Sequence, residues 1–486
     1  MIIEQKPLYN TLPVGQDIIF TVSDSTIIST KYRVKFTAQV YVADESSNLG
    51  LASYLVATLK VTPNNKGVGI FSMKPILESY VEPQQEGVEY LNASISQFKG
   101  VNYSLDNPHP IHLIDKYAVN KNNTRYFQVT FNIEYFDSAT STDRLSFLKP
   151  ILSEQYLIYN GVLDYDDPLK LYRNNYGYNL DVPKLIFNDF YGSLGKFISN
   201  APIEQYAKLS DYGTLSFFNF LNTSTNSFQV GTDNATLNRV DNIEISLYNS
   251  AGTLLVSPFQ IECIDSNGGW QYPSDFSAAR LLYFGAFPAN LDGWSTVWDT
   301  YKTQVSYYTL RAYDDNTAEI SQLYKINIIG NACKGFESIR LTWLNKYGTW
   351  DYYTFVKKSI KSLQTNRTSY TQQGGTWNDN TYRINGYKGG KKNFRVNTKQ
   401  LITVNTDFIN NSEAVWFEDL INSTEVYILN DYDDYLNDFR SGITNKYVEP
   451  VTLTTSSYVR KTKVNDKLIQ YTFQLEKTHN KRTQSV

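Results

Sequence analysis

Hydrophobic and polar residues alternate along several stretches of this 486-residue chain. Successive side chains of a β-strand point to opposite faces, so alternation predicts a strand with one buried face. The two clearest stretches contain hydrophobic residues at every second position. These residues are Tyr32, Val34, Phe36, Ala38, Val40 and Val42 in the first stretch, and Phe127, Val129, Phe131, Ile133 and Tyr135 in the second. We expect both stretches to form long strands.

Further strands and hairpins are predicted where such patterns meet across turn residues. They are Tyr54–Val61, Gly213–Leu221, Ile243–Tyr248 with Thr253–Val256, Tyr307–Tyr313 with Leu323–Ile329, Ile339–Trp343 with Trp350–Val356, Asn393–Val396, Leu401–Val404, and Tyr458–Val464 with a return strand that carries Ile469, Tyr471, Phe473 and Leu475. Residues 63–67, Pro-Asn-Asn-Lys-Gly, supply turn chemistry.

Two short helices interrupt this pattern. Met73–Val81 places hydrophobic residues on one helical face. Asn410, with Glu413 three residues later, resembles a capping box at the start of a second helix, whose hydrophobic residues are Trp416, Phe417, Leu420 and Ile421.

The sequence therefore predicts an all-β protein of several β-sandwich domains with one or two short helices. We expect an N-terminal sandwich at residues 1–140, a central sandwich with long loops at 141–330, and a C-terminal β-rich domain with one short helix at 331–486. A chain of this length ordinarily forms several domains. Short-period repeats of the kind found in fibrous shafts are absent from the sequence.

Composition supports the β prediction. The chain has 39 Tyr and 26 Phe but only 2 Met, and aromatic side chains suit both pleated sheets and protein interfaces. Its net charge is −3, from 45 basic and 48 acidic residues, and we expect these to be distributed without a basic stripe. On that expectation, no direct nucleic-acid site is predicted.

The cellular location is inferred from the lack of a disulfide scaffold, of a secretory signal and of a membrane-spanning segment in the sequence. Cys263 and Cys333 are the only cysteines, too few for a disulfide scaffold, and we expect two buried thiols. The N-terminus lacks the layout of a secretory signal, and no hydrophobic run approaches the roughly 20 residues that cross a bilayer. We expect a protein made in a cytoplasm, without a membrane contact.

Candidate metal ligands are few. His109 and His112 flank Pro110 in a segment that we expect to be a solvated loop, and His479 lies in the polar tail. A structural zinc site needs four ligands, and no matching set stands at a recognisable spacing. Acidic clusters at 164–167 and 431–434 lack the glycine and glutamate of a calcium-binding EF-hand loop. We predict no metal and no cofactor.

Catalytic motifs are also missing. Gly374-Gly375 and the glycines at 386–390 lack the spacing of phosphate-binding loops, and no Gly-x-Ser-x-Gly elbow occurs. No carboxylate pair is singled out for glycoside hydrolysis. Trp343, Trp350 and Trp377 would suit a sugar-stacking platform, but we favour a position in the core or at a subunit interface. We therefore predict no enzymatic activity and no catalytic residues.

One segment carries a resemblance to a known group of proteins. Residues 339–355, IRLTWLNKYGTWDYYTF, preceded by Cys333, resemble a block in structural proteins of tailed bacteriophages and prophages of Bacteroidetes hosts, the crAss-like phages among them. The segments 17–42, 413–429 and 451–475 resemble other blocks of these proteins, so the likeness spans most of the chain. The resemblance implies a virion component of the tail, baseplate or neck.

From these observations we expect a non-enzymatic virion structural protein that forms an oligomeric ring or hub. Its partners would be other virion proteins and copies of itself, assembled in the host cytoplasm. Candidate contact elements are residues 172–178, residues 386–392 and the C-terminal tail. The alternatives are a glycan-binding receptor module of a tail fibre or spike, with an aromatic groove near Trp377, and a polysaccharide-degrading enzyme.

Overall fold

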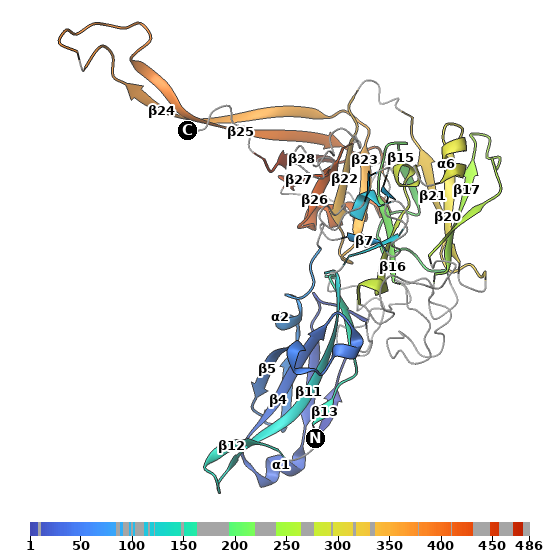
Figure 1. The fold of residues 1–486 in the computed structure, drawn as a ribbon, viewed down its shortest axis with the longest axis vertical. Helices are drawn as coiled ribbons and strands as arrows, with labels where there is room; N and C mark the ends of the chain where they lie inside the picture. Colours follow the sequence, from blue (N-terminus) through green and yellow to red (C-terminus); the bar gives the residue numbers. More distant parts are fainter. Residues whose placement is uncertain are drawn as a thin grey trace.

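The computed structural model describes residues 1–7, 11–83, 88–90, 97–98, 101–102, 111–114, 117–120, 122–146, 150–162, 194–218, 240–263, 277–292, 295–313, 317–330, 336–377, 379–409, 411–430, 448–455 and 470–479. Figure 1 shows an elongated N-terminal sandwich, a body that contains the remaining sheets, and a long two-stranded arm that leaves the body in a different direction. The protein is therefore all-β and built from several sandwiches, as predicted.

The N-terminal sandwich packs a three-stranded sheet against a seven-stranded one. The first contains β1 (Ile2–Gln5), β3 (Ile19–Ser23) and β6 (Val68–Ser72). The second contains β2 (Thr11–Pro13), β14 (Tyr156–Tyr159), β11 (Thr124–Asp137), β4 (Tyr32–Ala43), β5 (Leu55–Val61), β12 (Thr142–Leu145) and β13 (Ile151–Leu152). Phe20 and Phe131, one from each sheet, meet at 5.6 Å between ring centroids, so the buried faces of the two sheets form one core.

The two longest strands of this sandwich confirm the alternating pattern. In β4 and β11, each predicted core residue except Tyr32 is buried, whereas Tyr32, at the beginning of β4, is 77% exposed.

The helices of this sandwich are short: α1 (Ser25–Thr30), which Asp24 caps, and α2 (Lys74–Leu77), a single turn within the predicted helix at 73–81. Two 3-10 turns, η1 (Ser46–Asn48) and η2 (Ala52–Tyr54), precede β5.

The central part of the body contains a four-stranded and a five-stranded sheet around one hydrophobic core. The first is β16 (Thr214–Phe218), β19 (Leu281–Gly285), β10 (Tyr117–Asn120) and β7 (Val88–Tyr90), and the second is β15 (Glu204–Ala207), β21 (Tyr324–Ile328), β20 (Tyr307–Tyr313), β17 (Asn242–Tyr248) and β18 (Phe259–Glu262). Short elements accompany these sheets: β8 (Gln97–Phe98), β9 (Val101–Asn102), η3 (Ile111–Leu113), η4 (Ser277–Arg280), α5 (Pro288–Leu291) and α6 (Thr296–Tyr301).

The C-terminal sheet has seven strands and carries the arm. In spatial order they are β23 (Trp350–Phe355), β22 (Ile339–Leu344), β26 (Val426–Leu429), β27 (Val448–Leu453), β28 (Thr472–Lys477), β25 (Gly390–Asn405) and β24 (Ile360–Gln372). Helix α7 (Asn411–Asn422) packs its predicted hydrophobic face on this sheet, with Trp416 and Phe417 buried against Trp343. The predicted β22–β23 hairpin is confirmed, with Leu344 opposite Trp350.

One prediction of strand pairing and one of strand length were wrong. Beyond the turn at 249–252, Leu254 forms only an isolated bridge with Tyr248, and the strand that returns along β17 is β18, while β20 pairs with the other edge of β17. The predicted short strands at 393–396 and 401–404 are parts of one 16-residue strand, β25. Its partner β24 was not predicted at all.

The turn between β22 and β23 joins the C-terminal sheet to the N-terminal sandwich. Gly348 has a backbone φ of +74°, which glycine tolerates without steric cost. A Cβ on Gly348 would overlap the carbonyl oxygen of Asn160, just after β14. The Asn123 side chain donates to the Gly348 carbonyl at 3.0 Å, and the Val162 amide donates to the Lys346 carbonyl at 2.7 Å. The turn therefore fixes the junction between these two parts.

We expect Gly348→Ala to lower the free energy of unfolding by at least about 2 kcal/mol, because it adds a backbone clash to an unfavourable φ. Thermal unfolding followed by circular dichroism measures the loss. Gly252→Ala is the matched control: Gly252 has a φ of +77°, but the nearest atom to an added Cβ lies 3.7 Å away. Equal losses in the two variants would contradict a packing role for Gly348.

Candidate functional site

His112 is buried inside the body, which corrects the expectation of a solvated loop. It lies in η3, its side chain is 0% exposed, and its Nδ1 is 2.7 Å from the Tyr352 hydroxyl. The Trp350 ring meets it edge-on at 4.8 Å between centroids. Burial, together with the nearby Arg340 charge, lowers the pKa of His112 to about 3. This histidine is therefore a neutral core residue.

A second buried polar group connects three parts of the body. Asp351 of β23 accepts hydrogen bonds from Ser199 at 2.5 Å, from Asn345 at 2.9 Å and from the Trp416 indole at 2.7 Å. Burial raises the pKa of Asp351 to about 6, although these three bonds favour its charged form. The three donors come from the segment before β15, from the β22–β23 turn and from α7. The carboxylate therefore holds the turn and α7 in place.

Arg340 of β22 is the centre of a third buried network. Its Nε donates to the Tyr212 carbonyl at 2.6 Å and its Nη1 to Thr354 at 2.8 Å. The carboxylate of Asp211 lies 3.5 Å from Nη1, with both side chains 3% exposed. The guanidinium also stacks over the Phe287 ring, with Cζ 4.5 Å from the centroid. This network joins the C-terminal sheet to the loop before β16.

The remaining sequence candidates do not form a chemical site in the described parts of the chain. Trp343 and Trp350 are buried in the cores, as expected, whereas Trp377 is 64% exposed on the arm, so the three tryptophans form no common platform. Cys263 is buried, and His479 is exposed. Outside the described residues lie His109, Cys333, the acidic clusters at 164–167 and 431–434, and the contact candidate at 172–178.

Metal binding finds no support in the described part of the chain. None of its residues forms a group of three or more His, Cys, Asp or Glu side chains that could hold an ion. The glycines near 374 and 386–390 lie at the arm and not between a strand and a helix, which is the context that a phosphate-binding loop requires.

The arm is the most prominent surface feature of the molecule. It comprises residues 360–405: β24, a tip at 373–389, and β25. The two strands pair in register from Ile360 opposite Thr403 to Gln372 opposite Gly390. β24 has 13 residues, so the ribbon extends about 40 Å at the ordinary rise of a strand. Figure 1 shows it reaching well beyond the described part of the body.

Positive charge is concentrated on the arm, which corrects the expectation that the chain has no basic stripe. Its 46 residues contain eight Lys or Arg and one carboxylate, Asp379, a net charge of +7, so the rest of the chain carries −10. Near the base, Lys361 and Lys399 pair with Glu337 and Glu476. Among the described residues, no carboxylate pairs with the other six, which are Arg367, Arg383, Lys388, Lys391, Lys392 and Arg395.

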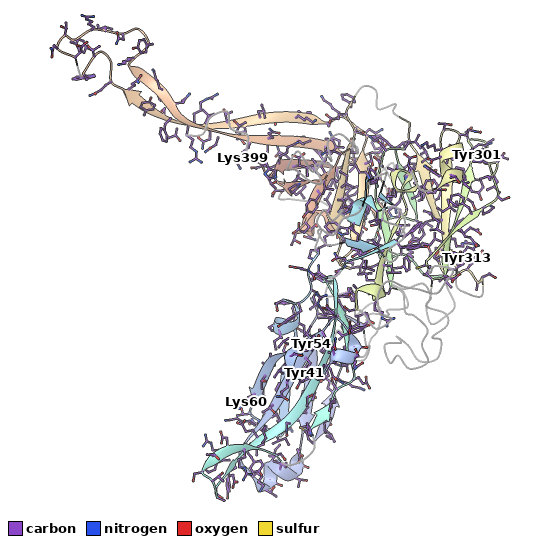
Figure 2. The ribbon with its side chains drawn as sticks, in the orientation of Figure 1. Tyr41, Tyr54, Lys60, Tyr301, Tyr313 and Lys399 are labelled. Carbon is purple, nitrogen blue, oxygen red and sulfur yellow. The ribbon has the colours of Figure 1, made fainter. Side chains whose placement is uncertain are left out.

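Large hydrophobic side chains are exposed on the same arm. Those at the tip are Trp377, Tyr382, Ile384 and Tyr387, with exposed fractions of 64%, 61%, 84% and 74%. Leu363 and Phe394 are exposed along the ribbon. Side chains project from the whole length of the arm in Figure 2, where Lys399 is labelled. Exposed hydrophobic residues gathered in this way indicate an interaction surface.

The tip is ordered by its own contacts. The Thr376 hydroxyl donates to the Thr381 carbonyl at 2.7 Å and accepts from the Arg383 amide at 2.9 Å. The rings of Trp377 and Tyr382 meet edge-on at 6.2 Å. At the other side of the tip, Lys392 donates to the Tyr387 carbonyl at 2.8 Å. These contacts constrain the backbone of the tip and bring the rings of Trp377 and Tyr382 together, which reduces the entropic cost of binding.

Comparison with known proteins gives no match, either to a family model or to a curated protein. In the described part of the chain, no helix has the length and hydrophobicity needed to cross a membrane. The buried His112, Asp351 and Arg340 networks are structural, and the arm is the feature best suited to function. The sequence indicated two parts of the arm, residues 386–392 and Trp377, but not the ribbon or its positive charge, which a count of charges over residues 360–405 would have found.

Proposed function

We propose that this chain is a non-enzymatic structural protein of a tailed-phage virion. It would form part of the tail, baseplate or neck and assemble with other virion proteins and with copies of itself. The observation that carries the proposal is the arm: an extended ribbon whose tip exposes four large hydrophobic side chains and is braced by hydrogen bonds of its own. Such an element suits contact with another folded protein and not turnover of a small molecule.

The likeness of residues 339–355 to phage structural proteins also supports this function, and the packing gives that segment a physical role. It forms the β22–β23 hairpin, whose buried side chains Trp343 and Asp351 fix helix α7. Its turn packs on Asn160 of the N-terminal part. A hairpin that joins several parts of one subunit in this way suits a component that must transmit load without deforming.

The proposal is tested by the mass of the purified protein, measured by light scattering, together with cryo-electron microscopy of whole particles. A closed oligomer, or density with symmetry-related copies around the tail axis, is expected. A monomer found only at the tips of fibres would contradict it.

A second function is favoured by one observation, the exposed pair of Trp377 and Tyr382 at the arm tip. Aromatic faces of this kind also bind sugar rings, so the chain would act as a glycan-binding module of a tail fibre or spike. Binding to host capsular polysaccharide on a glycan array, lost in Trp377→Ser, would support this alternative. Absence of binding would favour the structural function.

A further inference from the structure

A groove in the body has properties that complement the arm. It lies between β15, the chain after β23, and the segment that leads into α7, and it has a volume of about 520 Å³. Tyr206 and Phe408 line it and are 53% and 57% exposed. Trp416 and Tyr353 form part of its wall. The groove therefore offers hydrophobic surface in a concave setting.

Negative charge surrounds this groove. Glu204, Asp407 and Glu413 line it, and none of the described lining residues is Lys or Arg. Lys325 and Lys357 pair with Glu204 and Asp407 from outside the lining. The segment 406–430, which contains α7, has five carboxylates and no basic residue.

The negative charge affects the hydroxyl group of Tyr206, one of the tyrosines that line the groove. The pKa of Tyr206 is raised, first by partial burial and then by the negative charges of Glu204, Glu413 and Asp407, against an opposing effect of Lys325. Three carboxylates on different segments thus act on one hydroxyl group, and two of them, Glu204 and Asp407, already pair with lysines.

The arm of the same chain cannot fill this groove. Val356, four residues before β24, lines the groove, so the groove lies at the base of the arm. The tip lies about 40 Å away along a ribbon that is hydrogen-bonded over its whole length. Folding the tip back would break that ladder. A partner for the tip must therefore come from another molecule.

We propose that the arm tip of one copy docks in the acidic, aromatic groove of a second copy of this chain. The inference rests on the proposed self-assembly and names the surfaces that would perform it. Arg383 and Lys388 would face the groove carboxylates, and Ile384 and Tyr387 would bury against Tyr206 and Phe408. Because the two surfaces differ, the contact is head-to-tail, and it closes into a ring when the rotation between copies allows.

A second copy fits the arm better than nucleic acid does. Basic side chains alone would suit a phosphate backbone. The arm, however, also exposes the aliphatic side chains of Leu363 and Ile384, for which a phosphate backbone offers no apolar surface. The groove supplies both the opposite charge and the hydrophobic area, on a chain whose charge outside the arm is −10.

The test compares full-length variants by light scattering over a range of protein concentrations. Ile384→Ser with Tyr387→Ser on the arm, and Phe408→Ser in the groove, should each weaken self-association about tenfold or more. Tyr32→Ser is the matched control, because Tyr32 is as exposed as Tyr387 but lies on the N-terminal sandwich. It should leave association unchanged. Circular dichroism verifies that the variants remain folded.

A cross-link identifies the surface directly. A photo-reactive phenylalanine analogue in place of Tyr387 should link to peptides containing residues 202–206 or 407–416. In mixtures of heavy- and light-isotope chains, the linked peptides should come from different copies. Cross-links confined to other surfaces would overturn the inference.

The outcomes separate this inference from the proposed function. If the native chain assembles and the arm and groove variants assemble equally well, the docking is wrong while the structural function stands. If the native chain stays monomeric and its arm binds a DNA duplex in a salt-dependent way, the arm is a nucleic-acid element and the docking is wrong. A monomer without DNA binding would overturn both the docking and the self-assembly.

Discussion

When the pH is lowered from 7.5 to 4.5, the free energy of unfolding should fall by about 3 kcal/mol less in a His112→Gln variant than in the native chain. The pKa of His112 is lowered from 6.5 to about 3 in the folded protein, chiefly by burial. Over this pH range His112 therefore binds a proton in the unfolded chain but not in the folded chain. His112 favours folding above pH 6.5, and this contribution is lost as the pH falls towards 3.

Urea titrations at the two pH values measure the effect. Hydrogen exchange of peptides from β23 isolates the body from the N-terminal sandwich, since the parts of a large chain need not unfold together. His479→Gln is the matched control, because His479 is exposed. A native chain whose β23 peptides respond to pH no differently from those of His112→Gln would refute the prediction.

Asp351 acts in the opposite direction over the same pH range. Its pKa is raised from 3.8 to about 6 by burial, so the folded chain binds a proton that the unfolded chain releases. Its stabilising contribution is present below pH 3.8 and is lost as the pH rises through 6. The two groups therefore offset each other in the native chain, and the contribution of His112 is visible only when the variant is compared with the native chain.

Arg340→Met should lower the free energy of unfolding by about 3–5 kcal/mol, because it leaves Asp211 buried without its cation. Asp211 would retain bonds from the Thr354 hydroxyl at 2.6 Å and from the Lys208 amide at 2.8 Å, which do not neutralise its charge. Urea unfolding, read again from β23, measures the loss.

The double variant Arg340→Met with Asp211→Leu is the decisive comparison. Replacing both charges by apolar groups removes the unpaired carboxylate, so the double variant should be more stable than Arg340→Met alone. Losses that simply add would show that the two side chains act independently.

The sequence predicted β4 and β11 most clearly, because each places one face in the hydrophobic core. In β4 and β11, alternate side chains enter the core, and this alternation is visible in the sequence. β24 escaped prediction for the opposite reason: nearly all of its residues are exposed on both faces, so no period of two exists. Only the base of β25 has buried side chains, at Ile402 and Val404, so the pattern divided this one strand into two short ones.

The remaining features could not be predicted because they depend on contacts between residues that are far apart in the sequence. The environment of His112 is made by Trp350 and Tyr352, more than 230 positions away in the sequence. Its neighbours in sequence, two prolines and an asparagine, suggested a loop. Likewise, the groove joins residues near 205, 356 and 407, and no local pattern brings these together. The predicted contact element at 386–392 lies at the arm tip and the beginning of β25; whether it binds a partner stays a prediction.

The arm also has two open edges. β24 is the last strand of its sheet, and β25 pairs with β28 only from Leu401 to Asn405. Unpaired backbone groups on a ribbon with exposed hydrophobic side chains are a hazard for aggregation, and lysine is a common safeguard on such edges. Mutual repulsion between cationic ribbons would keep newly made subunits from pairing edge to edge. High salt, which screens that repulsion, should therefore make a preparation of free subunits more prone to precipitate.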